Sequence, residues 1–254
     1  MKIVVCIKQV VTRDFQVRPN EARTWIRDAD AEFEMNEPDA YALEAALRLR
    51  EAHGGEVIAV SAGPSRVTQV LREALARGAD RALHVEGDGL PQADAFVVAE
   101  ALAAAIGPEA PDLVLTGLQS DDMGFGQTGV ILAERLGVAH ATIIMDVTVQ
   151  GSGLRVKREL EGGWFQWLEM PLPALLTIQS GINQLRYATL KGIMAAKKKE
   201  IRPVSPPAPQ PAQRVVDLRA PEKHKQTRMI AGTAAEAARE LVRALREDAR
   251  VVAQ

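Results

Sequence analysis

Residues 2–7, with the sequence KIVVCI, decide the fold. This run is short, apolar and rich in β-branched residues, which is typical of a parallel strand covered on both faces. We therefore expect it to form the first and central strand of a sheet. After a polar loop, Asn36 is expected to cap a helix that begins with Glu37, Pro38 and Asp39 and ends near the glycines at 54–55.

Strands and helices alternate after this first pair. The pattern predicts strands at 57–60, 81–85 and 113–115, and helices at 65–77, 94–106 and 128–136. Such alternation predicts a parallel sheet with right-handed crossovers and helices on both faces, an α/β fold of the Rossmann-like type. Beyond residue 139 the pattern changes to strands at 143–149, 154–158 and 165–168, joined by glycine turns, which predicts a β-hairpin extension near 140–170. Residues 174–178 then predict a strand that returns to the main sheet.

The last fifty residues have a different composition from the rest. Four prolines between 205 and 211 favour an extended linker, so we expect the α/β domain to span 1–204 and the linker with a C-terminal arm to span 205–254. Thr233 and Glu236 form a capping box in front of an amphipathic helix. That helix needs a surface to pack on, either a partner subunit or its own domain, and the sequence leaves both open.

Composition excludes several classes of function. A net charge of -2 gives no general attraction to nucleic acid. The single cysteine, Cys6, cannot form an internal disulfide, and no apolar stretch reaches the roughly 18 residues that span a bilayer, so we expect a cytoplasmic protein that is not membrane-spanning. The four histidines are scattered, and neither a Walker loop nor a Gly-x-Gly-x-x-Gly loop follows the first strand. We predict no metal site and no catalytic residues.

Three loops at the predicted carboxyl ends of strands are candidate binding loops. They follow Ile7, cover 61–64 and cover 116–129. The third is rich in glycine and leads into a helix N-terminus, a combination that favours a phosphate. Asp121 and Asp122 in this loop are candidates either to bind a ribose or to cap and turn the loop.

Bulky residues crowd one predicted hairpin strand. Trp164, Phe165 and Trp167 would put aromatic groups on both faces, because alternate residues of a strand point to opposite sides. We favour contact with a partner over the alternative that one face covers the domain's own core. The run Lys197-Lys198-Lys199 is, by itself, typical of a solvated surface.

Five segments together resemble the beta subunit of electron-transfer flavoproteins, over nearly the whole chain. They are Met35-Asn36, 59–64, 117–129, 156–163 with the apolar strand that follows, and 186–190 with 193–199. The resemblance implies an adenine-nucleotide-binding α/β domain that holds AMP in a structural role, and a redox FAD that is bound mostly by a larger alpha subunit.

The resemblance also implies site residues. By position, the AMP pocket would be lined by Cys6, Asn36, Glu37, Pro38, Asp39, Ala62, Asp122, Met123, Gly124, Phe125, Gly126, Gln127, Thr128, Gly129, Val130 and Ala133. Arg158 and Glu159 would approach the isoalloxazine ring of FAD, where a charged pair tunes the flavin's potential. Phe15 is the candidate for an aromatic contact to the flavin.

A recognition loop near 183–200 is implied as well. It would use Arg186, Tyr187, Leu190, Lys197 and Lys198, with Leu190 as an apolar anchor in a partner's pocket. The partners implied are the alpha subunit in a heterodimer, flavin dehydrogenases such as acyl-CoA dehydrogenases that donate electrons, and a membrane quinone oxidoreductase that accepts them. The chain would then be an electron carrier rather than an enzyme.

Two other functions stay open. A bifurcating flavoprotein would hold a second FAD in place of AMP and react with NADH, but Gln127-Thr128-Gly129 and the bulk of Phe125 favour AMP. An unrelated nucleotide-binding stress or sensor domain would share the fold, but it would not explain the hairpin segment or the 186–190 loop.

Overall fold

The computed structural model describes residues 1–29, 31–206, 209–221 and 227–251. These residues form two compact units, Met1–Leu218 and Arg219–Gln254. The first unit holds the sheet and its covering helices, and the second holds a single helix.

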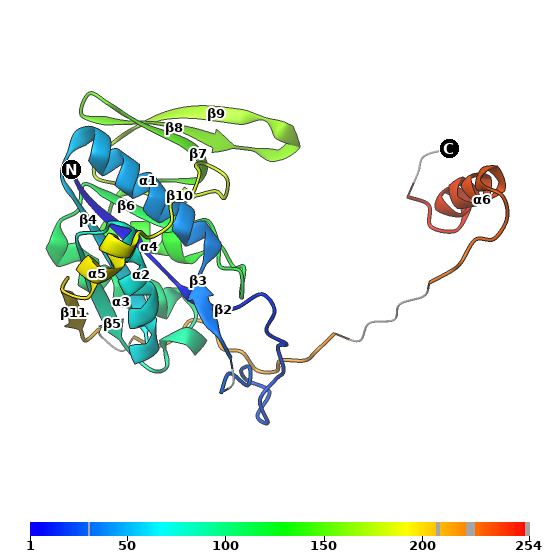
Figure 1. The fold of residues 1–254 in the computed structure, drawn as a ribbon, viewed down its shortest axis with the longest axis horizontal. Helices are drawn as coiled ribbons and strands as arrows, with labels where there is room; N and C mark the ends of the chain where they lie inside the picture. The colour runs from blue at the N-terminus through cyan, green and yellow to red at the C-terminus, as the bar shows by residue number, and fades with distance from the viewer. Residues whose placement is uncertain (30, 207–208, 222–226, 252–254) are drawn as a thin grey trace. The chain divides into compact units, whose positions relative to one another are not determined.

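A nine-stranded sheet is the centre of the first unit (Figure 1). Across the sheet the strands are β11 (Ile201–Val204), β5 (Arg81–Glu86), β4 (Glu56–Gly63), β1 (Lys2–Cys6), β6 (Leu113–Gly117), β10 (Ala174–Ile178), β7 (Ala139–Gln150), β8 (Gly153–Glu159) and β9 (Phe165–Pro171). All pairs from β11 to β7 are parallel, and β8 and β9 are antiparallel. The predicted hairpin extension is therefore confirmed, and it continues the main sheet.

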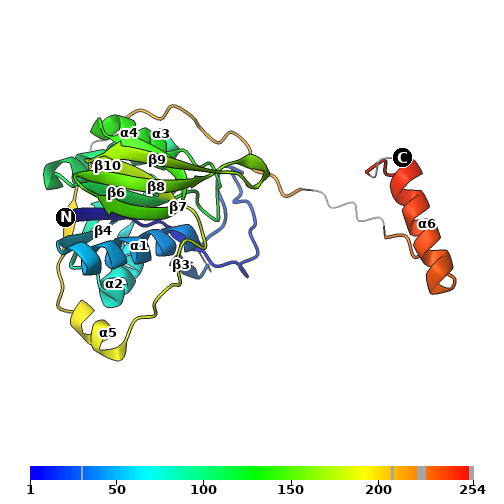
Figure 2. The same ribbon diagram turned by 90° about the horizontal axis from the view of Figure 1, so that it is seen from above.

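Helices cover both faces of the parallel part of the sheet, as Figure 2 shows. Ile3 and Val5 point to the face covered by α1 (Glu37–His53) and α2 (Thr68–Arg77). Val4 and Cys6 point to the other face, covered by α3 (Ala95–Ile106) and α4 (Thr128–Leu136). All four side chains are buried, so the doubly covered central strand and the α/β fold predicted from residues 2–7 are confirmed.

The chain changes direction across the sheet at β1. From β1 it runs to β4 and β5 on one side, and then crosses to β6 on the other side. In sheets of this kind ligands bind where the order reverses, beyond the carboxyl ends of the strands. The topology therefore places the candidate site next to the ends of β1, β4 and β6.

Some short elements were not predicted. They are β2 (Gln9–Val11) and β3 (Phe33–Met35), which pair with each other, β11, α5 (Leu190–Ala196) and the 3-10 helices η2 (Leu90–Gln92), η3 (Gly107–Glu109) and η4 (Glu161–Gly163). The helix predicted at 65–77 is present as the 3-10 helix η1 (Ser65–Val67) followed directly by α2. Elements of three or four residues are too short to show a periodic pattern. Strand β11 also contains Pro203, which a strand accommodates at the edge of a sheet.

The C-terminal part agrees with its predicted local structure. No strand or helix occurs at 205–206 and 209–221, and the rest of the predicted linker, Pro207 and Ala208, lies outside the described residues. The linker as far as Leu218 belongs to the first unit, in which Gln213 N donates to Asp94 Oδ2 at 2.6 Å and Leu218 N donates to Arg23 O at 2.7 Å. Helix α6 (Ala234–Glu247) begins with the predicted capping box of Thr233 and Glu236 and has no buried residue.

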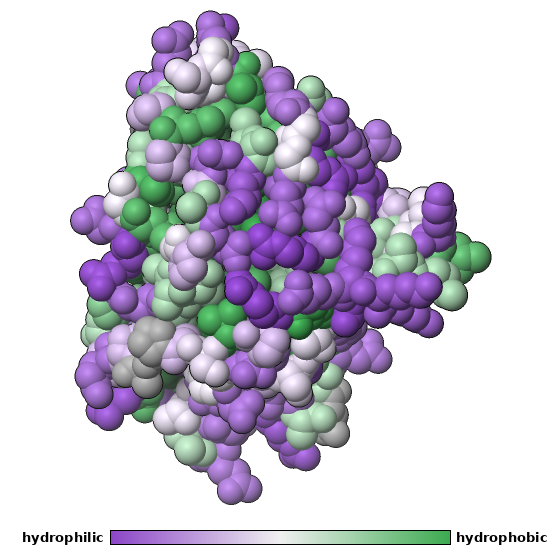
Figure 3. Space-filling model, turned by 90° about the vertical axis from the view of Figure 1, so that its left-hand side faces the viewer, coloured by the Kyte–Doolittle hydropathy of each residue, from purple (hydrophilic) through white to green (hydrophobic). Residues whose placement is uncertain are grey.

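The surface shown in Figure 3 carries small hydrophobic patches among hydrophilic residues. Within the described parts of the chain, no helix has the length and apolar character needed to cross a membrane. The same residues contain no cluster of three His, Cys, Asp or Glu side chains that could hold a metal ion.

Gly129 lies where α4 packs directly against the sheet, and the space there leaves no room for a side chain. A Cβ on Gly129 would lie 2.7 Å from Thr116 Oγ1 on β6 and 2.8 Å from Thr177 Cγ2 on β10. We expect Gly129→Ala to lower the free energy of unfolding by about 1–3 kcal/mol, as overpacking does in a dense interior. Gly107→Ala is the matched control, because a Cβ there meets nothing within 4 Å. Urea unfolding of both variants checks the difference, and equal midpoints would contradict it.

Candidate functional site

The start of α1 and the loop after β6 meet at the carboxyl ends of the central strands. Asn36 N donates to Lys8 O at 3.0 Å, which places the start of α1 directly beside the end of β1. The loop at 118–127 leaves β6 at the same edge and leads into α4. Most residues predicted to line a nucleotide pocket lie on these segments.

Asp39 joins the ends of β1 and β6. Its Oδ2 accepts from Lys8 N at 2.7 Å, and its Oδ1 accepts from Gly117 N at 2.8 Å. Gly117 is required here, because a Cβ would lie 2.5 Å from Asp39 Oδ1. Burial raises the pKa of Asp39 to about 6, even though both hydrogen bonds act to lower it. The carboxyl is therefore used to hold the strand ends together.

Asn36 and Asp121 join the start of α1 to the loop at 118–127 through reciprocal hydrogen bonds. Asn36 is the N-cap residue of α1, as predicted, but its side chain makes no cap hydrogen bond to the helix. Instead it binds the loop, donating from Nδ2 to Gln119 O at 3.1 Å and accepting at Oδ1 from Asp121 N at 2.9 Å. Asp121 Oδ2 accepts from Glu37 N at 3.3 Å, so the loop caps the helix. Asp121 therefore caps α1 rather than its own loop, and a contact of Asp121 with a ribose stays a prediction.

Lys8 is a site residue that sequence reasoning missed. Its Nζ donates to Asp122 Oδ1 at 2.6 Å and to Ser120 Oγ at 3.3 Å. Burial acts to raise the pKa of Asp122, but the Lys8 ammonium and hydrogen bonds from Ser120 and Met123 hold it below its usual range. Lys8 directly follows the apolar run at 2–7, and that position at the end of a central strand was the available signal.

The last part of the loop is open and ends at a free helix N-terminus. Gly124 and Gly126 have φ of 64° and 62°, a conformation that glycine adopts without strain. Gln127 precedes α4 and makes no side-chain cap hydrogen bond, so the first amides of α4 remain available to an acceptor. Phe125 between the two glycines is 54% exposed. This arrangement can bind an anion through backbone amides and the helix dipole.

Three predicted pocket residues lie on β1, β4 and α4. Cys6 at the end of β1 and Ala133 in α4 are buried in the same core cluster, and Ala62 on β4 is half-buried. Burial raises the pKa of the Cys6 thiol, and the nearby charge of Asp39 raises it further, so the thiol stays protonated. Next to Ala62, Ser61 Oγ is buried without a hydrogen-bond partner. Because alternate residues of a strand point to opposite faces, Ser61 shares the sheet face of Ala59, whereas Ala62 shares that of Val60.

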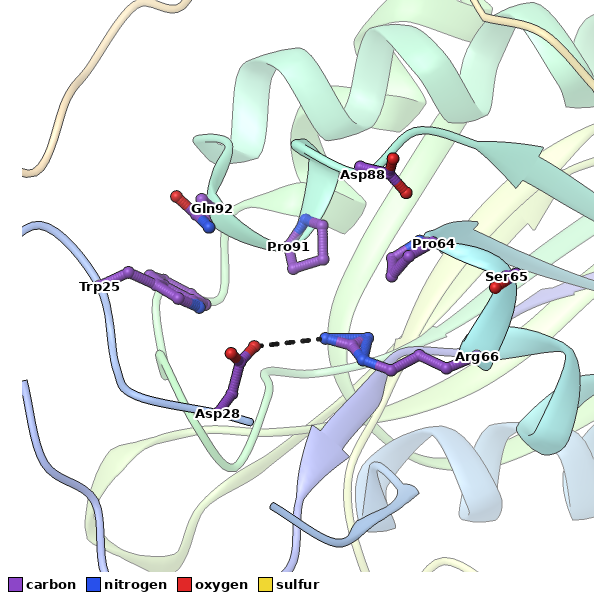
Figure 4. Close-up of a pocket in the computed structure, with 8 residues that line it drawn as sticks. All are labelled: Trp25, Asp28, Pro64, Ser65, Arg66, Asp88, Pro91 and Gln92. Atoms are coloured by element: carbon purple, nitrogen blue, oxygen red, sulfur yellow. Dashed lines mark ion pairs between the residues drawn. The ribbon is translucent and has the colours of Figure 1, made fainter. Parts of the chain in front are cut away.

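A pocket of about 250 Å³ lies beyond the ends of β4 and β5 (Figure 4). Trp25 and Asp28 of the long loop before β3 face Arg66 across it. Arg66 Nη2 lies 3.9 Å from Asp28 Oδ2, Arg66 Nη1 donates to Gln9 Oε1 at 3.2 Å, and the guanidinium lies 4.1 Å from the ring of Phe33. Arg66 thus holds the long loop against β2 and β3, and the pocket is separate from the residues predicted for AMP.

Arg158 and Glu159 lie together at the end of β8, where the hairpin returns to the main sheet. Arg158 Nη2 donates to Thr142 Oγ1 at 3.3 Å, while its Nε is buried without a partner. Glu159 Oε2 accepts from Gln179 Nε2 at 3.3 Å. The pair is held in place and keeps hydrogen-bonding capacity for another group. Phe15, the aromatic candidate, is half-buried in the long loop before β3.

The two faces of β9 differ. Leu168 and Met170 pack against the core, whereas Phe165 and Trp167 on the other face are exposed. Lys157 Nζ lies 3.9 Å from the Phe165 ring and the Arg155 guanidinium lies 4.4 Å from the Trp167 ring. Trp164, which directly precedes β9, is also exposed, so all three predicted aromatic residues are open. The alternative that one face of the strand covers the domain's own core is confirmed for Leu168 and Met170, and contact of the aromatic residues with a partner stays a prediction.

Segment 183–199 has an exposed middle and paired ends. Tyr187 and Leu190 are 89% and 78% exposed, and Lys197 and Lys198 are also exposed. Arg186 instead binds Glu44 and Glu51 on α1. Lys199 donates to the carbonyls of Leu75 and Ala79, and burial lowers its pKa, so the expectation that all of 197–199 is solvated is wrong for Lys199.

The comparisons with known proteins agree with each other. Residues 24–209 match the electron transfer flavoprotein domain family. The chain is 39% identical to the electron transfer flavoprotein subunit beta of Methylophilus methylotrophus, over 97% of this chain and 98% of the relative. It is also 39% identical to the human subunit beta, over 81% and 82% of the two chains, and to the mitochondrial subunit beta of Oryza sativa subsp. indica, over 99% and 100%.

The buried Asp39 carboxyl makes stability depend on pH. Its pKa is about 6 in the folded protein against an ordinary value of 3.8, so the folded state binds more protons between about pH 4 and 6. The contribution of Asp39 to the free energy of unfolding is therefore complete below about pH 4 and is lost as the pH rises to about 6. Relative to Asp39→Asn, we expect the wild type to lose up to about 3 kcal/mol of unfolding free energy across this window. Urea unfolding at pH 4, 5, 6 and 7 checks this, with the exposed Asp88→Asn as control. Parallel curves for wild type and Asp39→Asn would refute it.

Proposed function

Because this chain belongs to the electron transfer flavoprotein family and resembles its beta subunits from end to end, we propose that it is the carrier subunit of a heterodimer with an alpha subunit. In this role it accepts electrons from flavin dehydrogenases, such as acyl-CoA dehydrogenases, and passes them to a membrane quinone oxidoreductase. The observation that carries the carrier role is segment 183–199, whose exposed apolar centre offers a small docking surface. A small contact suits an encounter that must form and separate quickly.

Leu190 is the proposed anchor of the docking contact. It is the first residue of α5 and is exposed, with Tyr187 and Met194 exposed on the same short segment. Lys197 and Lys198 add positive charge next to these apolar groups. One apolar anchor among polar residues is the usual composition of an interaction hot spot.

AMP is the proposed ligand of the loop at 118–129. The uncapped amides of α4 suit its phosphate, and the two glycines in the loop let the backbone approach closely. Asp39 and Asn36 act on the pocket through its shape, because their side chains already bind the backbone of the loop and strand ends. The residues present therefore fit a nucleotide with a single phosphate.

FAD is the proposed redox group, shared with the alpha subunit, and it supplies the storage and release of electrons. Arg158, near the end of β8, would hold a fixed positive charge beside it. A cation at this position stabilises negative charge on a reduced flavin, and Glu159 next to it limits that effect. No proton transfer by a residue of this chain is needed for a carrier.

The first test is the nucleotide content of the heterodimer. We expect one FAD and one AMP per heterodimer, purified after coexpression with the alpha subunit and analysed by acid extraction, chromatography and visible absorbance. Two FAD per heterodimer would instead support the bifurcating alternative, in which NADH is the reductant. A preparation without any nucleotide would overturn both proposals.

The second test is truncation of the docking anchor. We expect Leu190→Ala to raise the KM for the heterodimer at least ~30-fold in an assay with a reduced acyl-CoA dehydrogenase, with little change in kcat, because a hot-spot side chain contributes about 2 kcal/mol or more. Val216→Ala is the control, since Val216 is 77% exposed but lies outside segment 183–199. Equal KM values for both variants would exclude Leu190 as the anchor.

A further inference from the structure

Segment 183–199 is attached to the domain at both ends, while its apolar middle faces solvent. The attachments use charged side chains of α1 and α2 that contact main-chain atoms and side chains of the segment. Both ends of the segment are therefore fixed to the domain, and the question is what these attachments do for the exposed Leu190 between them.

The N-terminal attachment is centred on Glu44, a carboxylate of α1 that is only 4% exposed. Arg186 Nε donates to Glu44 Oε2 at 2.7 Å, Arg186 Nη2 donates to Glu51 Oε2 at 3.0 Å, and Arg48 Nε donates to Glu44 Oε1 at 2.6 Å. Arg48 also donates to Gln184 O at 2.9 Å. Burial acts to raise the pKa of Glu44, but the two guanidinium groups lower it below its usual value, so the carboxylate stays charged.

The C-terminal attachment holds α5 against α2. Arg72 Nη1 donates to the carbonyls of Ala196 and Lys199, each at 2.6 Å. Lys199 Nζ donates back to carbonyls at the C-terminal end of α2 and just beyond it. Between these contacts α5 touches α2 through Gly192, where a Cβ would lie 2.3 Å from Ala76 O. Helix α5 is thus seated on α2 with its backbone in direct contact.

Arg186 is poorly placed to contact a partner directly. Both of its guanidinium edges already bind carboxylates, and the neighbouring carboxylates raise its pKa, Glu51 most and then Glu44. Releasing Arg186 would leave the charge of Glu44 buried with one partner fewer, which is costly. Its immediate neighbour Tyr187, in contrast, is almost fully exposed.

We infer that Arg186 is a positioning residue, which fixes segment 183–199 on α1 in the conformation that presents Leu190, and that Gly192 does the same from the side of α2. This inference rests on the proposed docking function and differs from the expectation that Arg186 itself recognises the partner. A rigid segment binds more tightly than a mobile one because less freedom is lost on docking. If only a fraction of molecules presents Leu190, the apparent affinity falls by that fraction.

A double-mutant cycle on the FAD-loaded heterodimer tests this inference. With reduced medium-chain acyl-CoA dehydrogenase as the probe, we expect Arg186→Ala to raise the KM for the heterodimer ~10-fold and leave kcat unchanged, as expected if the presenting fraction falls to about one tenth. The double variant Arg186→Ala/Leu190→Ala should be no more than ~2-fold worse than Leu190→Ala alone, because Arg186 acts only through Leu190. Fully additive effects would overturn the inference and assign Arg186 a direct contact.

Hydrogen exchange of the free heterodimer provides a readout that does not involve electron transfer. Arg186→Ala should accelerate exchange of the amides at 187–196 at least ~5-fold, whereas Leu190→Ala should leave them unchanged. Arg186→Lys should give an intermediate effect, since one ammonium cannot bind both carboxylates in the way a guanidinium does. Unchanged exchange in Arg186→Ala would overturn the inference.

Two further variants separate the possible failures. Gly192→Ala alters no exposed contact but pushes α5 away from Ala76, so it should raise KM as Arg186→Ala does. Arg135→Ala, which removes an arginine paired with Glu100 elsewhere on the surface, should change neither KM nor exchange at 187–196. If Leu190→Ala leaves KM unchanged, the proposed docking function fails. If Leu190→Ala raises KM but Arg186→Ala and Gly192→Ala do not, only the positioning role fails.

Discussion

The site depends on one buried carboxylate. Asp39 sits at the start of α1 and binds the amides that follow β1 and end β6, so a single side chain fixes the two strands between which the chain changes direction. Removing a carboxylate from water is expensive, and the two backbone hydrogen bonds offset much of that cost. Gly117 has no side chain because the carboxylate occupies the space a Cβ would take. The loop at 118–127 therefore leaves the sheet from a fixed point.

The polar groups discussed above divide into those that are paired within the protein and those that are not. Lys8, Arg66 and Arg186 pair with nearby carboxylates and hold loops in place. Other polar groups keep unfilled capacity, namely the first amides of α4, Ser61 Oγ and Arg158 Nε. The first group determines shape. Of the second group, the amides of α4 belong to the loop proposed to bind AMP, and Arg158 belongs to the strand proposed to approach FAD.

The sequence predicted the parts of the structure that repeat a pattern. The apolar run at 2–7, the alternation that follows and the capping box at Thr233 all appear as expected, because burial and capping depend on residue type and spacing. Pairing between distant residues could not be predicted in this way. The Lys8–Asp122 ion pair and the Asn36–Asp121 hydrogen bond each join segments more than eighty residues apart. Nothing in the local sequence specifies which acceptor binds which donor.

Helix α5 is held on α2 through main-chain atoms, so the backbone conformation of segment 183–199 does not depend on its exposed side chains. Arg72 binds main-chain carbonyls of residues 196 and 199, and Gly192 touches α2 with its backbone, so neither contact depends on which side chains the segment exposes. Residues such as Tyr187, Ile193 and Met194 can therefore change during evolution without altering the backbone that carries them. If this segment is the proposed docking surface, a change of electron donor can be met by exchanging its exposed side chains one at a time while the backbone stays constant.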